Sequence, residues 1–129
     1  MIVVDSSVLI DMYRRIDNAR TSKLRQIAGR SQVIVLDVVM LEVLQGARDD
    51  LHGLRLEKNL REFRLERAIT VDLAVEGAQY SCKLRALGIT IRKTVDIIIG
   101  TYCIQHDHQL LHNDRDFLPM VKHLGLKEY

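Results

Sequence analysis

The chain has 129 residues, of which 47% are apolar and 28% charged, and its formal net charge is +2. This composition excludes an intrinsically disordered chain, and the length suits a single domain spanning residues 1–129. No segment reaches the roughly 18 apolar residues of a membrane span, and the start MIVVDSS lacks the features of a secretion signal, so we expect a cytoplasmic protein.

Short β-branched runs bounded by polar residues predict buried strands, and the patterns between them predict helices. The predicted strands are 2–4, 33–36, 69–71 and 110–111, the last two with weaker signals. The predicted helices are 8–14, 19–28, 38–47, 50–67, 72–87 and 95–105, with Asp37, Asp72 and Thr94 as N-caps and Gly46 and Gly88 near helix ends. Strands that alternate with helices favour a parallel sheet covered on both faces, an α/β three-layer sandwich.

Basic residues gather in two parts of the chain, which suits a polyanionic partner. The first group is Arg14, Arg15, Arg20, Lys23, Arg25 and Arg30, and the second is Arg55, Lys58, Arg61, Arg64 and Arg67. Glu57, Glu62 and Glu66 are interspersed in the second group, so a solvated helix face with i,i+4 ion pairs explains it equally well.

Acidic residues occur in segments that are otherwise apolar. Asp5 ends the first predicted strand, Glu42 interrupts the apolar helix of LDVVMLEVLQG, and Asp96 lies in the first turn of KTVDIIIGTYCI. Asp114 and Asp116 follow the strand of LLHNDRDF. Taken singly, each acid has a structural explanation as a cap, a salt-bridge partner or a first-turn helix residue.

Considered together, these acids predict a metal site. The carboxyl ends of parallel strands share one edge of the sheet, and carboxylates packed there repel each other unless a cation neutralises them. Lys93 is the nearest basic residue in sequence to the apolar segments. Oxygen ligands without a nearby Cys or His pattern favour Mg²⁺ or Mn²⁺, and such a site can support hydrolysis of a phosphodiester bond.

The four motifs VVDSSVLI, LEVLQG, TVDIIIGTYC and LLHNDRDF together resemble the PIN-domain ribonucleases, specifically the VapC-type toxins of toxin–antitoxin modules. The resemblance covers essentially the whole chain and implies a PIN-like α/β/α sandwich with a parallel sheet of four to five strands. It also implies Mg²⁺- or Mn²⁺-dependent cleavage of RNA, with tRNA and rRNA as possible substrates, a homodimer, and inhibition by a cognate VapB-type antitoxin. The residues that it implies are Asp5, Glu42, Asp96 and Asp114 as catalytic acids, Asp5, Asp96, Asp114 and Asp116 at the metal, and Ser7, Thr94 and Asn113 as supporting polar groups.

Several alternatives stay open at this stage. Asp114 and Asp116 compete for the role of fourth acid, although Asp114 is favoured, and the apolar residues of 50–67 either bind the antitoxin or pack on the body. A PIN-like module without catalysis is the main alternative function. A haloacid-dehalogenase-type phosphatase is disfavoured because it needs a second Asp two residues after the first, where this chain has Ser7. His106, His108, His112 and His123 are expected at the surface, with His112 near the site entrance.

Overall fold

The computed structural model describes residues 1–29 and 32–129, and the strands within them form one parallel sheet in the order β3-β2-β1-β4-β5. The strands are β1 (Ile2–Val4), β2 (Val33–Leu36), β3 (Arg64–Glu66), β4 (Gln109–Leu111) and β5 (Lys127–Glu128). Every residue of β1 and β2 is buried, as their unbroken apolar runs predict for inner strands covered on both faces. The predicted parallel sheet of four to five strands is confirmed.

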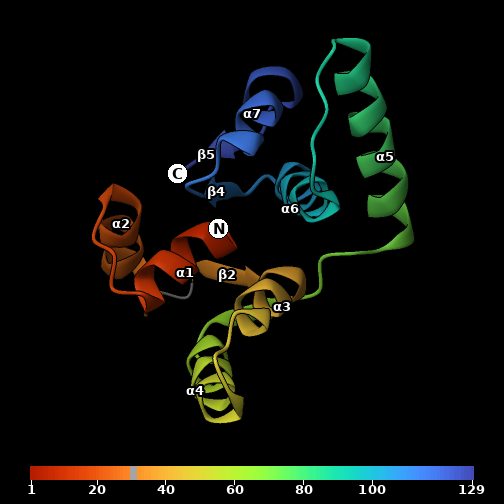
Figure 1. The fold of residues 1–129 in the computed structure, drawn as a ribbon. Helices are drawn as coiled ribbons and strands as arrows, with labels where there is room; N and C mark the ends of the chain where they lie inside the picture. The colour runs from red at the N-terminus through yellow and green to blue at the C-terminus, as the bar shows by residue number, and fades with distance from the viewer. Residues whose placement is uncertain (30–31) are drawn as a thin grey trace.

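Helices cover both faces of this sheet. They are α1 (Ser6–Tyr13), α2 (Ala19–Ile27), α3 (Asp37–Gln45), α4 (Asp50–Leu60), α5 (Val71–Ala86), α6 (Thr94–Gln105) and α7 (Leu118–Leu124), with a 3₁₀ turn at Arg115–Phe117. The chain runs outward from β1 to β3 and then returns across the sheet to β4 and β5, so right-handed crossovers put α1 to α4 on one face and α5 to α7 on the other. Figure 1 shows these two groups on either side of the strands, with α4 projecting beside α3. Of the helices described, none is both long and apolar enough to cross a bilayer.

Two boundaries in the middle of the chain differ from the prediction. The helix expected over 50–67 ends at Leu60, and the third strand lies at Arg64–Glu66 rather than at 69–71. Ile69 is 48% exposed in the link between β3 and α5, and Val71 is the first residue of α5. Pairing with β2, which sets Val35 opposite Leu65, stabilises a charged edge strand that its own composition does not favour.

Each residue predicted as an N-cap lies inside its helix, one or two positions after the residue that occupies the N-cap. Leu36, Thr70 and Lys93 occupy the N-cap positions, and Thr70 caps α5 by accepting from the Leu73 amide at 3.1 Å. Asp37 instead accepts from the Ala68 amide at 3.0 Å and so holds the link after β3. The two helix ends at Gly46 and Gly88 are confirmed, and Gly88 has φ +78°, which favours glycine.

The basic groups are solvated in different ways. Arg61 pairs with Glu57 at 2.7 Å as an exposed i,i+4 pair, as the simpler explanation predicts. Arg64 instead pairs with Glu66 at 2.6 Å within strand β3, so this pair does not belong to a helix face. Arg25 of the first group pairs with Asp17. Arg30 of that group lies outside the described residues.

Candidate active site

Asp5 follows β1 at the point where the sheet reverses its direction of winding. The crossover after β1 leaves toward one face and the one after β4 toward the other, which makes the carboxyl ends of these neighbouring strands a topological switch point. The Asp5 amide donates to the Leu111 carbonyl at 2.9 Å and so links the two strand ends. The Asp5 side chain is 3% exposed, and its Oδ2 accepts from the Ser7 amide at 3.0 Å and the Ser7 hydroxyl at 2.5 Å.

The segment after β4 brings two more acids to the same place. The Asn113 amide donates to Ser7 Oγ at 3.0 Å, so Ser7 connects the β1 and β4 ends directly. Asp114 caps the 3₁₀ turn by accepting from the Asp116 amide at 3.0 Å. His112, which we expected at the surface, is only 7% exposed, so that expectation is wrong for this histidine.

Two helices supply the remaining acids. Asp96 lies in the first turn of α6 and is 3% exposed, and its Oδ2 is buried without a hydrogen-bond partner among the described residues. Glu42 on α3 is half-buried, as its apolar helix predicts, and its Oε1 accepts from the Ser6 hydroxyl at 3.1 Å. Ser6 was not among the predicted site residues, and its signal in the sequence was its position directly after Asp5, where a strand-to-helix cap was the alternative explanation.

The carboxylates affect one another's ionisation. Carboxylate oxygens of Asp96, Asp114 and Asp116 lie within 4.8 Å of one another. Burial, followed by the charges of Asp5 and Asp114, raises the pKa of Asp96 to about 7. Burial also raises the pKa of Asp5, although the hydrogen bonds from Ser7 oppose it. The pKa of Glu42 is raised by burial and by Asp5, against the hydrogen bond from Ser6.

One cation, Lys93, acts on the buried and half-buried acids of the two helices. Lys93 lowers the pKa of both Asp96 and Glu42, but these shifts stay upward overall because burial is the larger effect. Lys93 is exposed at the N-terminus of α6 and reaches neither carboxylate by an ion pair among the described residues. The acids therefore keep an uncompensated negative charge when they ionise.

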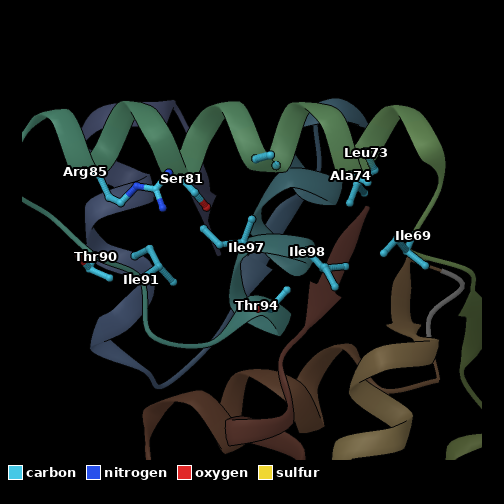
Figure 2. A pocket seen from close by; sticks show the side chains of 12 residues that line it. Ile69, Leu73, Ala74, Ser81, Arg85, Thr90, Ile91, Thr94, Ile97 and Ile98 are labelled. Atoms are coloured by element: carbon cyan, nitrogen blue, oxygen red, sulfur yellow. The ribbon is translucent and has the colours of Figure 1, made fainter.

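The other two supporting residues, Asn113 and Thr94, lie in different surroundings. Asn113 is exposed, and its side chain amide donates to Asp11 Oδ2 at 3.4 Å. Thr94 is also exposed, and it lines a groove of about 370 Å³ between α5 and α6. Figure 2 shows this groove with Leu73, Ile97 and Ile98 on its walls. It is mostly apolar and has none of the acids in its lining.

The family model described as PIN domain matches residues 2–121 of the chain. The chain belongs to the PIN-domain family. Solved structures confirm the PIN fold at low sequence identity. FitAcB of Neisseria gonorrhoeae has a TM-score of 0.80 at 18% identity, over 100% of this chain and 96% of that chain. VapBC2 of Rickettsia felis, bound to a DNA fragment from its promoter, has a TM-score of 0.79 at 13% identity, over 100% and 98%.

A third structure with the PIN fold is VapC20 of Mycobacterium tuberculosis, described as a toxin that cleaves the sarcin-ricin loop. Its TM-score is 0.72 at 16% identity, over 100% of this chain and 98% of that chain. In all three comparisons the similarity covers the whole of this chain, so the sheet and both helical layers belong to the shared fold. The predicted fold family is thereby confirmed.

Proposed function

We propose that this PIN domain is a metal-dependent endoribonuclease toxin of the VapC type. The observation that carries the proposal is the convergence of Asp5, Glu42, Asp96 and Asp114 at the switch point, with Asp116 beside them. Several carboxylates gathered in a buried site are destabilising by themselves, and a bound cation supplies the compensation that the side chains do not. The fold shared with VapC20 supports the reaction class.

The side chains fit a hard divalent cation. Asp96 Oδ2 is buried and lacks a partner within the described residues, while the neighbouring carboxylate oxygens are near enough to share an ion. We assign the metal to Asp5, Asp96, Asp114 and Asp116, and an all-oxygen donor set favours Mg²⁺ or Mn²⁺. When bound, such an ion activates water for attack on phosphorus and stabilises the leaving oxygen.

The protein's own residues hold this arrangement in place. Ser7 donates to Asp5 and accepts from the Asn113 amide, and so joins two of the proposed metal-binding segments. Ser6 orients Glu42, the proposed catalytic acid on the opposite helical layer from Asp96. The raised pKa of Glu42 lets Oε1 or Oε2 hold a proton more readily than an ordinary glutamate does.

A cavity beside the acids that carries two arginines supports RNA as the substrate. It has a volume of about 370 Å³, and its lining includes Arg20 and Arg115 together with the acids Asp114 and Glu128. Neither arginine side chain is among the ion pairs of the described residues, and guanidinium groups bind phosphate in bidentate fashion. We assign these arginines to backbone phosphates that flank the cut site, in a tRNA or a ribosomal RNA loop.

Partner surfaces follow from exposed apolar residues. Leu51 and Leu54 on α4 are 59% and 63% exposed, whereas Leu56 and Leu60 on the same helix are buried. The helix thus packs on the body by one face and offers the other, which we assign to a VapB-type antitoxin. We assign the second apolar surface, at Val71 and Val75 on α5, to a homodimer contact.

The decisive experiment replaces two of the buried acids and, as a control, one exposed acid. Asp5→Asn should abolish RNA cleavage and growth arrest, as should Asp96→Asn, while both variants stay folded. Asp37→Asn is the matched control, because Asp37 also follows an inner strand but is exposed and caps the Ala68 amide, which Asn can replace. Full activity in Asp5→Asn and Asp96→Asn would refute the proposal. If the wild-type protein also binds no Mn²⁺ in calorimetric titration, the proposed nuclease function gives way to that of a non-catalytic binding module.

A further inference from the structure

His112 is held on both ring nitrogens directly beside the proposed metal site. Its Nδ1 lies 3.2 Å from the Asp114 amide nitrogen, and its Nε2 lies 2.8 Å from Glu128 Oε1. The Phe117 ring packs against the imidazole with a centroid distance of 4.9 Å and an interplanar angle of 54°. The ring is buried, so its orientation is fixed from three sides.

The hydrogen bonds define which nitrogen carries the proton. An amide N–H can only donate, so Nδ1 must be the unprotonated acceptor in its contact with Asp114. The proton therefore sits on Nε2, which donates to the Glu128 carboxylate. Glu128 stabilises this tautomer and thereby keeps Nδ1 available to the Asp114 amide.

The bond from the Asp114 amide to His112 is one of three hydrogen bonds that hold the backbone after β4. The amides of Asn113, Asp114 and Asp116 donate to Ser7 Oγ, His112 Nδ1 and Asp114 Oδ1, at 3.0, 3.2 and 3.0 Å. Carboxylates that repel one another must be held by the backbone that carries them if they are to bind one ion with fixed geometry. Of these acceptors, only the imidazole depends on a residue from the edge strand β5.

We propose that His112 and Glu128 are a positioning pair that sets the backbone of Asp114 for metal binding. The inference rests on the proposed function, which it deepens. Strand β5 is two residues long and exposed, and its register with β4 sets Leu110 opposite Glu128. Pairing of β5 therefore brings the Glu128 carboxylate to the residue that follows β4, and a remote chain segment determines the geometry of the acids.

Variants of Glu128 separate positioning from general stability. Glu128→Ala removes the acceptor, and Glu128→Gln keeps an oxygen that accepts from Nε2–H. We expect Glu128→Ala to weaken Mn²⁺ binding about tenfold and to lower kcat. Glu128→Gln should restore both values close to wild type. Lys127→Ala is the matched control, because it removes the ion pair to Asp107 from the same strand but does not touch the imidazole.

A metal-free measurement tests the same pair without reference to activity. The ¹⁵N shifts of the His112 ring should report a proton on Nε2, and hydrogen exchange at the Asp114 amide should be faster in Glu128→Ala than in wild type and Lys127→Ala. Equal Mn²⁺ affinity in wild type and Glu128→Ala overturns the positioning role. So does a Glu128→Gln variant as weak as Glu128→Ala. If the wild-type protein binds no Mn²⁺ and cuts no RNA, the proposed function itself fails.

Discussion

Asp96 should make the metal-free protein less stable as the pH rises. Its pKa in the folded state is about 7, raised from 3.8 by burial and the neighbouring acids, so the folded state keeps a proton that the unfolded chain releases. The resulting stability is fully present below about pH 4 and is lost as the pH rises to the folded pKa. With 1.36 kcal/mol for each tenfold change, the difference between 3.8 and about 7 corresponds to about 4 kcal/mol.

Replacing this carboxylate by an amide removes the titration. We expect Asp96→Asn to be more stable than wild type by about 2–4 kcal/mol at pH 8, with the two proteins converging below about pH 4. Urea unfolding in the presence of EDTA across this pH range measures the difference. Asp72→Asn is the matched control, because Asp72 is an exposed acid in the first turn of α5.

Two outcomes would contradict this reasoning. One is an Asp96→Asn variant whose unfolding free energy falls between pH 4 and pH 8 as steeply as that of wild type. The other is a variant that is less stable than wild type at pH 8. In either case the burial and repulsion at Asp96 would not be the source of the pH dependence, and the electrostatic case for a bound cation would lose its main support.

The remaining predictions concern the substrate, a helix cap and the dimer. Arg115→Ala should raise KM for RNA several-fold with kcat kept and should reduce the salt dependence of binding by about one phosphate contact, whereas Arg48→Ala, away from the cavity, should not. Asn18 accepts from the Arg20 and Thr21 amides as the N-cap of α2, so Asn18→Ala should cost about 1–2 kcal/mol in urea unfolding, and Asn18→Ser should recover part of it. Val75→Asp should convert the proposed dimer to a monomer in light scattering; an unchanged mass would place the contact elsewhere.

The buried strands and the acids that follow them were predictable because their signals are local. Two inner strands read as continuous apolar runs, and an acid at the end of such a run is visible in the sequence without knowledge of its neighbours. Asp5 and Asp96 are both 3% exposed, and Glu42 is half-buried, as their apolar contexts indicate. Their meeting at one sheet edge then follows from the parallel topology alone.

The edge of the sheet was harder to predict because long-range pairing decides it. The segment Arg64–Glu66 has little intrinsic preference for a strand, yet β2 offers it free backbone groups, while Ile69 has no strand beside it and stays exposed. The burial of His112 had no local signal either. It depends on Glu128, sixteen positions later, and on the register of a two-residue strand that the sequence did not indicate.

The hydrogen bonds around the acids indicate that the cluster has a functional role rather than a role in stability. A core selected for stability alone would replace Asp96 with an apolar residue, since its Oδ2 is buried and lacks a partner in the described part of the chain. Instead, Ser6, Ser7 and His112 fix the carboxylates or the backbone that carries them. These bonds orient the charges without neutralising them, which is the arrangement expected where a cation is to be bound between them.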